Sequence, residues 1–187
     1  AYADLQKEAL VIGAGNRAEI WNPAEYEKDV GDMDADAVEA ATDGHVTVTV
    51  YSGEQLGKES DVTSAVAMSA KTCDIVCTGP SELSKYDPVF SLFDAPYVFD
   101  DGDALVAFAN SDKAHELYDT LAEASNLRCL GMYYYGSREV TTIGYAATEP
   151  SGLAGCKLRV PDSEMAMAYG AALGATPTVM SLGEVYM

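Results

Sequence analysis

The sequence predicts an α/β fold in which helices cover a mostly parallel sheet. Two observations support this prediction: helical and strand-like stretches alternate along the chain, and the strand-like stretches are short runs of apolar or alternating residues. A chain of 187 residues with 48% hydrophobic residues and twelve tyrosines can bury a sizeable core, which argues against a disordered acidic tail. One or two globular domains are expected.

The first half of the chain contains two helix–strand pairs. Four elements are predicted: a helix over residues 32–43, a strand over 46–51, a helix over 58–71 and a buried strand over 73–78. In the first of these helices, acidic residues in the first turn are typical of a helix start, and Gly44 directly after the last turn is typical of a helix end. Strict alternation predicts the first strand, and Gly79-Pro80 closes the second.

The second half continues the alternation. Its predicted elements are a helix capped by Ser111, strand-like stretches over 127–135 and 139–143, a strand over 155–161, a helix over 163–173 and a strand over 176–180. Residues 148–155 form a turn-rich joint that predicts a lobe boundary. Ser181 and Glu184 have the spacing of a capping box.

Arg159 is one of four arginines in the chain, and its position is informative. Alternation in the 155–161 strand places Lys157 and Arg159 on one face, and Pro161 ends the strand. Arg159 therefore lies near the carboxyl end of a strand, where open α/β sheets bind ligands. A guanidinium can hold a carboxylate through two parallel hydrogen bonds, which lysine cannot do. The alternative is a solvated surface arginine.

The charge of the chain limits its partners. Thirty acidic against eleven basic residues give a formal net charge of −19, which argues against nucleic acid because phosphate binding needs a basic surface. An anionic ligand must then be attracted locally, by one or two well-placed cations. Solubility alone is the alternative explanation of the charge.

Cysteines and histidines do not predict a metal site. In an extended run, the Cα atoms of Cys73 and Cys77 lie about 13 Å apart, too far for a disulfide or shared metal ligation. The chain has two histidines, so a zinc site is not expected, and the four cysteines are interpreted as small buried thiols. No metal or cofactor is predicted.

The ends of the sequence predict truncation. No stretch is long and apolar enough to cross a membrane, and the chain does not begin with a signal peptide. It starts abruptly at Ala1-Tyr2-Ala3-Asp4, and the capping box at Ser181 opens a helix that the sequence does not continue. Both ends are therefore interpreted as truncated.

Six stretches in one order then carry a family resemblance. They cover residues 38–44, 51–57, 93–99 (Phe-Asp-Ala-Pro-Tyr-Val-Phe), 136–142 (Gly-Ser-Arg-Glu-Val-Thr-Thr), 152–161 and 173–180, the last followed by Glu184-Val185-Tyr186. From about residue 32 to 187 the chain resembles the extracytoplasmic solute-binding receptors of TRAP transporters, the DctP-type family. One stretch alone would be weak; their shared order over most of the chain is specific.

The resemblance implies a two-lobed, periplasmic-binding-protein-like fold that closes over a small organic acid and delivers it to the membrane subunits of a TRAP transporter. It implies an extracytoplasmic location, with an arginine at the position of Arg159 pairing with the ligand carboxylate and Arg138 lining the cleft. The alternative for Arg138 is an inter-strand ion pair with Glu139 or with another of the many acidic residues. Glu82 and Tyr86 follow the Gly79-Pro80 break, where a loop could reach the cleft. The sequence does not identify the ligand; monocarboxylates, dicarboxylates, keto acids and sugar acids all fit an arginine anchor.

Two departures from that family are expected. The second lobe, 148–187, is short beside lobe I, 32–147, so we expect weaker binding than in a full-length receptor, and self-association through the face of the 163–173 helix that carries Met165, Ala168, Tyr169 and Ala172. The family's first strand is expected to be replaced, because residues 1–31 resemble a hairpin and helix of an MraZ-type, AbrB-like regulator, with strands at 10–12 and 17–21 and Pro23 opening the helix.

Other functions remain as alternatives. Residues 13–18 also match a dinucleotide-binding pattern, which we reject because Pro23 would interrupt the phosphate-binding helix. The regulator-like segment lacks its family's Asp-x-x-x-Arg element, so DNA binding is not implied. An α/β enzyme is the remaining alternative, but no catalytic triad spacing or phosphate loop is present in the sequence.

Overall fold

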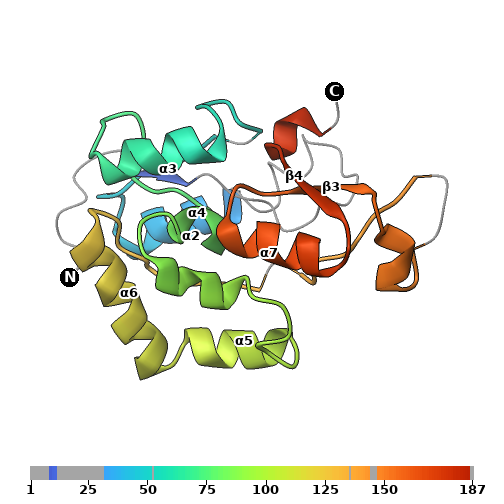
Figure 1. Ribbon diagram of the computed structural model, residues 1–187. Helices are drawn as coiled ribbons and strands as arrows, with labels where there is room; N and C mark the ends of the chain where they lie inside the picture. The colour runs from blue at the N-terminus through green and yellow to red at the C-terminus, as the bar shows by residue number, and fades with distance from the viewer. Residues whose placement is uncertain (1–8, 12–31, 52, 135, 144–146, 186–187) are drawn as a thin grey trace. The chain divides into compact units, whose positions relative to one another are not determined.

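A parallel strand pair opens the fold. In the computed structural model, which describes residues 9–11, 32–51, 53–134, 136–143 and 147–185, β1 (Ala9–Val11) pairs with β2 (Val48–Val50), with Leu10 opposite Thr49. The helix α2 (Asp32–Ala41) lies between the two strands in the sequence (Figure 1). Thus β1, α2 and β2 have the strand–helix–strand order predicted for an α/β fold.

This pairing corrects one expectation about the N-terminal segment. A strand is present ahead of α2, close to the predicted 10–12 strand, and it pairs in parallel with β2. The prediction that the first strand of the sheet is replaced is therefore wrong. The second predicted hairpin strand, 17–21, and the helix opening at Pro23 lie outside the described residues.

The chain forms two compact units, residues 1–78 and 79–187, each described here by itself. In the first unit, α3 (Glu59–Ala67) buries Val62, which packs with Cys73 and with the half-buried Tyr51 and Val66. The predicted strand over 73–78 does not form: the Cys73 thiol donates to the Ile75 carbonyl at 3.1 Å, a local bond typical of a turn. The lobe boundary predicted at residue 148 stays a prediction.

The second unit combines a helical layer with a second parallel strand pair. Its helical and 3-10 elements before the strands are α4 (Pro80–Leu83), η2 (Pro88–Phe93), α5 (Gly102–Ala109), α6 (Asp112–Ala124) and η3 (Pro150–Leu153). Then come β3 (Lys157–Val160), α7 (Glu164–Ala172), β4 (Thr176–Val179) and η4 (Leu182–Glu184). As predicted, Ser111 caps α6, and Ser181 and Glu184 form a capping box, although it opens only the short η4.

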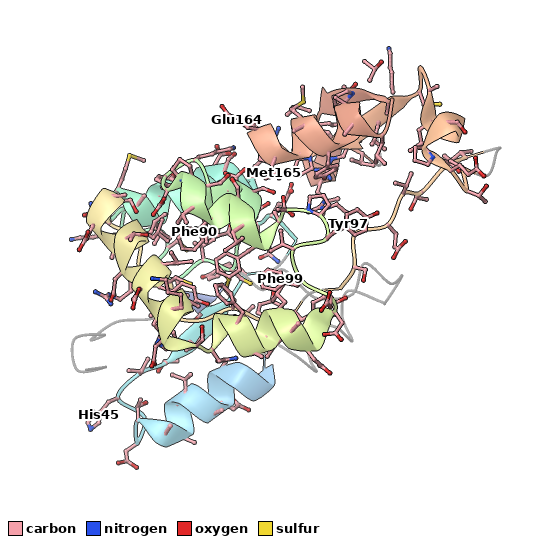
Figure 2. All side chains as sticks on the ribbon, turned by 60° about the horizontal axis from the view of Figure 1, so that its bottom comes forward. His45, Phe90, Tyr97, Phe99, Glu164 and Met165 are labelled. Atoms are coloured by element: carbon pink, nitrogen blue, oxygen red, sulfur yellow. The ribbon has the colours of Figure 1, made fainter. Side chains whose placement is uncertain are left out.

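An aromatic cluster holds the helical layer together. All four phenylalanines of the chain belong to it, and Phe93 lies at its centre, with ring centroids 5.8 Å from both Phe90 and Phe108. Figure 2 shows Phe90 and Phe99 in the space enclosed by these helices. Tyr118 of α6 completes the cluster, and its hydroxyl donates to the Ala109 carbonyl at 2.8 Å. Edge-tilted aromatic contacts of this kind stabilise a core beyond their buried area.

Within the second unit, β3, α7 and β4 form a compact strand–helix–strand motif. β3 and β4 are parallel, with Arg159 opposite Thr178, and α7 packs on both strands (Figure 1). Gly170 makes the close approach of helix and sheet possible: a Cβ at this position would lie 3.0 Å from the Pro177 Cβ.

One prediction about the second unit is wrong. No strand forms over the described residues of 127–135 and 139–143, where Leu130, Tyr133 and Val140 are exposed rather than packed on a sheet. In α7, Ala166 and Gly170 are buried, and these small residues allow the helix to lie close to the strands. Ala168 and Ala172, on the face predicted to mediate self-association, are exposed.

Candidate functional site

Arg159 lies where the sequence predicted, near the carboxyl end of β3. Its side chain is half-buried, and Nε donates to the Met180 carbonyl at 2.8 Å, just beyond the end of β4. This bond fixes the plane of the guanidinium relative to the two strands. Such pre-orientation is what a planar, bidentate contact with a carboxylate requires.

Arg138 is held by a carboxylate that the sequence analysis did not single out. Its Nη2 donates to Asp94 Oδ1 at 2.7 Å, and the other oxygen of Asp94 accepts from the Ser81 hydroxyl at 2.7 Å. Burial disfavours the charged guanidinium, but the negative charge of Asp94 and its hydrogen bond outweigh burial and raise the pKa of Arg138. The Asp94 side chain is 9% exposed and that of Arg138 53% exposed, so the arginine keeps access to solvent.

Tyr169 of α7 brings the two arginines into one neighbourhood. The Arg138 Cζ lies over its ring, 5.9 Å from the centroid, which is cation–π distance. Burial raises the pKa of the Tyr169 hydroxyl; the charge of Arg138 opposes this rise, that of Asp94 adds to it, and that of Arg159 opposes it. Both predicted arginines therefore act electrostatically on one tyrosine.

Glu82 and Lys85 form a second charged group. Glu82 lies in the first turn of α4, not in the predicted loop. Gly79 and Pro80 begin this short helix, whereas the sequence predicted that they only end the preceding strand. Lys85 Nζ lies 2.9 Å from Glu82 Oε1 and 2.8 Å from Asp162 Oδ2, which ties α4 to the residues just after β3. Burial disfavours the ammonium, but the hydrogen bonds that Lys85 donates to Asp162 and Glu82 outweigh burial and raise the pKa of Lys85.

Tyr86 lies just after α4. It is half-buried, and its backbone N–H donates to the Leu83 carbonyl at 3.0 Å. Of the four predicted residues, Arg138 lies over the ring of Tyr169, and the charge of Arg159 also opposes the rise in the pKa of that tyrosine. Glu82 is linked through Lys85 to Asp162, three positions after Arg159. A contact of Tyr86 with this group stays a prediction.

The residues that the sequence analysis missed are Asp94, Ser81, Tyr169 and Lys85. A signal existed for the first of them, since Asp94 stands in the family-like stretch 93–99 directly after a phenylalanine. Tyr169 was considered only as part of an apolar helix face. Neither pattern indicates which arginine these side chains would meet.

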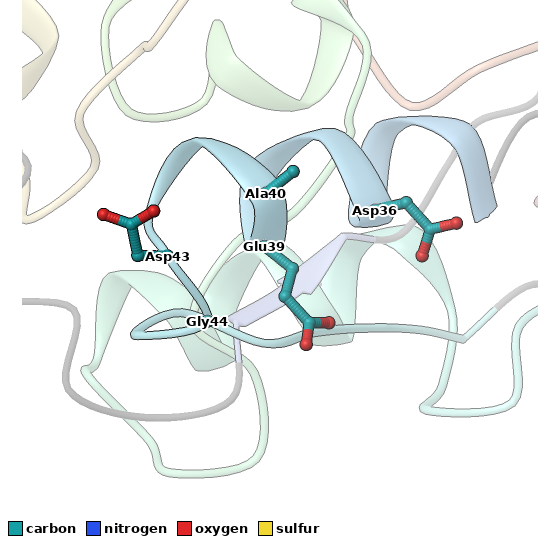
Figure 3. A pocket seen from close by; sticks show the side chains of 5 residues that line it. All are labelled: Asp36, Glu39, Ala40, Asp43 and Gly44. Atoms are coloured by element: carbon teal, nitrogen blue, oxygen red, sulfur yellow. The ribbon is translucent and has the colours of Figure 1, made fainter.

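A hollow on the first unit does not suit an acid. It has a volume of about 450 Å³ and is lined by Asp36, Glu39, Ala40, Asp43 and Gly44 of α2 and its end (Figure 3). Three carboxylates would repel an anionic ligand, and Figure 3 shows them pointing in different directions. None of the predicted site residues lines it.

Potential metal-binding side chains are scattered over the part of the chain that the structure describes. Within the described ranges, no three His, Cys, Asp or Glu side chains lie close enough together to hold a metal ion. The four cysteines are free thiols, and Cys73 is the buried one. Among those same residues, no helix is both long and apolar enough to cross a bilayer.

Comparison with known proteins gives a family and several relatives. The family model described as "Bacterial extracellular solute-binding protein, family 7" (DctP) matches residues 20–187. A solute-binding protein of Roseobacter denitrificans is 30% identical over 78% of this chain and 43% of its own length. The sialic acid-binding periplasmic protein SiaP of Vibrio cholerae is 30% identical over 83% of this chain and 47% of its own.

The C4-dicarboxylate-binding periplasmic protein DctP of Rhodobacter capsulatus is 32% identical over 79% of this chain and 44% of its own length. The chain thus spans about half the length of the curated relatives it matches. Among solved structures, a TRAP periplasmic solute-binding protein of Bradyrhizobium, in complex with galacturonate, superposes with a TM-score of 0.82 at 24% identity, over 96% of this chain and 57% of that one.

The same comparisons bear on the N-terminal segment. None supports the predicted likeness of residues 1–31 to an MraZ-type regulator. The family model already begins at residue 20, and the alignment with the ectoine-binding periplasmic protein TeaA of Halomonas elongata extends over 95% of this chain. Together with the parallel β1–β2 pair ahead of the rest of the fold, these matches show that the chain belongs to the DctP family of bacterial extracellular solute-binding proteins.

Proposed function

We propose that this chain works as an extracytoplasmic solute-binding protein of a TRAP-type transporter and captures a small organic acid through an ion pair between Arg159 and the ligand carboxylate. The observation that carries the proposal is the position of Arg159 near the carboxyl end of β3, where its Nε donates to the Met180 carbonyl, in a chain with few cations. Arg159, at the end of a strand and held by a backbone carbonyl, is suited to bind an anion without rearranging.

The names of the relatives support the acid class of the ligand. They include proteins that bind sialic acid, C4-dicarboxylates and 2,3-diketo-L-gulonate, and solved structures with bound D-glucuronate and galacturonate. All of these ligands carry a carboxyl group. We therefore assign Arg159 as the anchor of this group and Arg138 as a further cleft residue, with Glu82 and Tyr86 as flanking contacts.

Binding without chemistry is the second part of the proposal. The relatives are named for binding and not for a reaction, so we infer that the chain is not an enzyme. Its partners would be the membrane subunits of the transporter, which receive the acid outside the cytoplasm. Self-association of the chain remains a prediction.

Matched ligands test this function. Thermal unfolding of the protein would be followed with D-galacturonate, D-glucuronate, N-acetylneuraminate and succinate, and with D-galactose as the neutral control for D-galacturonate. A ligand at 100 times its Kd stabilises the folded state by about 2.7 kcal/mol, which is a readily measured shift. We expect an acid to raise the midpoint and galactose to have no effect, with no product detected by NMR. Equal stabilisation by galactose, or turnover of the acid, would contradict the proposal.

A further inference from the structure

The carboxylate of Asp94 faces Arg138 inside the proposed site, and it bears on the charge of the ligand. We propose that Asp94 restricts the site to monoanionic acids, because it already provides the carboxylate that Arg138 would otherwise take from a dicarboxylate. This inference rests on the proposed function and adds to it the substrate class: a monocarboxylate whose remaining groups are neutral hydrogen-bonding oxygens.

The position of Asp94 is fixed from two sides. Its two carboxylate oxygens are both engaged, Oδ1 with Arg138 Nη2 and Oδ2 with the Ser81 hydroxyl, each at 2.7 Å. Ser81 is itself buried in α4. Asp94 also directly follows Phe93, the centre of the aromatic cluster, and its backbone N–H donates to the Ser91 carbonyl at 3.2 Å. Turning Asp94 away from Arg138 would break these bonds and leave polar groups in a nearly buried place.

The charges around the arginines oppose a second ligand carboxylate. To reach Arg138, that carboxylate would approach Asp94, a like charge whose side chain is 9% exposed and little screened by water. The neighbouring group adds no spare cation, since Lys85 is shared between the carboxylates of Glu82 and Asp162. Arg138, Arg159 and Lys85 are thus matched in number by Asp94, Glu82 and Asp162, so this group of side chains has no net positive charge to offset a second ligand carboxylate.

The exposed part of Arg138 suits a neutral oxygen. A guanidinium has five N–H donors, and the bond to Asp94 uses a donor on Nη2. With its charge balanced by Asp94 and its side chain 53% exposed, Arg138 can donate its other hydrogens to a hydroxyl or carbonyl oxygen. The structure therefore favours a hydroxylated monocarboxylic acid over a dicarboxylic one.

The test compares acids that differ at one carbon. Galactonate and galactarate share the hydroxyls of their inner carbons and differ only in the oxidation state of the terminal carbon; 4-hydroxybutyrate and succinate form a second such pair. Calorimetric titration of the wild-type protein identifies the pair that binds. Within that pair, the monoacid should bind at least ten times more tightly than the diacid. Tighter binding of the diacid by the wild type would overturn the inference without any variant.

The variant Asp94→Asn removes the charge and keeps the shape. It should shift the affinity ratio at least tenfold toward the diacid, because Arg138 regains an unbalanced charge. Asp119→Asn is the matched control: it removes one negative charge from an exposed ion pair with Arg128 in the same unit and should leave the ratio unchanged. A ratio that shifts equally in both variants, or in neither, overturns the role of Asp94.

Two further results keep the outcomes distinct. Should Asp94→Asn not fold, Ser81→Ala keeps the charge of Asp94 but removes one of its anchoring bonds, and it should shift the ratio in the same direction by a smaller factor. An unchanged ratio in folded Ser81→Ala would then count against the inference. If the wild type binds none of the acids, the proposed function itself fails; if it binds both members of a pair equally, the proposed function stands and the inference about Asp94 is overturned.

Discussion

The Asp94 carboxylate lies 2.7 Å from the guanidinium of Arg138, although 44 positions separate the two residues. Asp94 follows the central phenylalanine of the aromatic cluster, and Arg138 lies over the ring of Tyr169 on α7. One ion pair and one cation–π contact, both made by Arg138, therefore link the core of the helical layer to the strand–helix–strand motif that carries Arg159. The proposed ligand site would take its rigidity from this junction.

Replacement of Arg159 by lysine tests whether the proposed contact is bidentate. Lysine keeps the charge but loses both the planar fork and the Nε donor that binds the Met180 carbonyl. We expect Arg159→Lys to weaken binding of the acid by on the order of 1–3 kcal/mol, as for a charge-assisted hydrogen bond. Arg159→Ala should abolish binding while the protein stays folded. Isothermal titration with the acid that stabilises the wild type provides the measurement.

The matched control is Arg128→Ala, which removes an exposed arginine whose Nη1 lies 3.6 Å from Asp119. It should bind the acid like the wild type. If Arg159→Lys also binds like the wild type, then Arg159 acts only as a diffuse positive charge. If Arg128→Ala weakens binding as much as Arg159→Ala, net charge rather than a site would govern affinity.

Local patterns predicted the regular elements well. The strand with Arg159, the helix after it and the strand of residues 176–179 were confirmed within a few residues, because alternation, a serine cap and a stop at Gly174 are signals contained in adjacent positions. The strands expected near residues 73 and 130 did not form. An apolar run indicates that a segment is buried. A strand also needs a neighbouring strand for its backbone hydrogen bonds, and the sequence does not show which segment provides it.

The site was predicted less completely than the fold. Arg159 and Arg138 were predicted as ligand contacts from the residues of the strand and from the family resemblance, and this role stays a prediction; the partner of Arg138, Asp94, was not predicted. Its role depends on a contact across 44 positions, and a sequence with thirty acidic residues offers too many candidates for that contact. The role of Gly170 was missed for a related reason. It allows Pro177 and Val160 to approach the helix closely, and no local sequence pattern indicates such a contact.

Substitution of Gly170 tests how closely α7 must pack on β3 and β4. A Cβ at this position would lie 3.0 Å from the Pro177 Cβ and 3.4 Å from Val160 Cγ1. Gly170→Val should therefore reduce the free energy of unfolding by about 2 kcal/mol, the usual cost of overpacking. Ala171→Val places the same side chain on the exposed side of α7 and should cost only about 0.5 kcal/mol of helix propensity. Urea unfolding of the two variants gives the comparison, and equal losses would mean that the helix can shift freely.

Tyr118 links the aromatic cluster to the stability of the protein at alkaline pH. Its side chain is 6% exposed, and burial, with the charge of Cys129 adding, raises its pKa to about 12. Between pH 10 and 12 the folded protein keeps the phenolic proton while the unfolded chain loses it. The contribution of Tyr118 to stability is thus complete below pH 10 and lost as the pH rises toward 12. Tyr118→Phe should cost about 1 kcal/mol at pH 7, because the Ala109 carbonyl loses its 2.8 Å hydrogen bond.

Above pH 10 the difference between Tyr118→Phe and the wild type should narrow, since the phenylalanine has no proton to lose. Urea unfolding at intervals from pH 7 to 12 measures both curves. Tyr97→Phe is the control: the Tyr97 side chain is fully exposed, so its replacement should change neither the stability at pH 7 nor the alkaline slope. Curves for Tyr118→Phe and the wild type that stay parallel up to pH 12 would show that the buried phenol does not hold its proton in the folded protein.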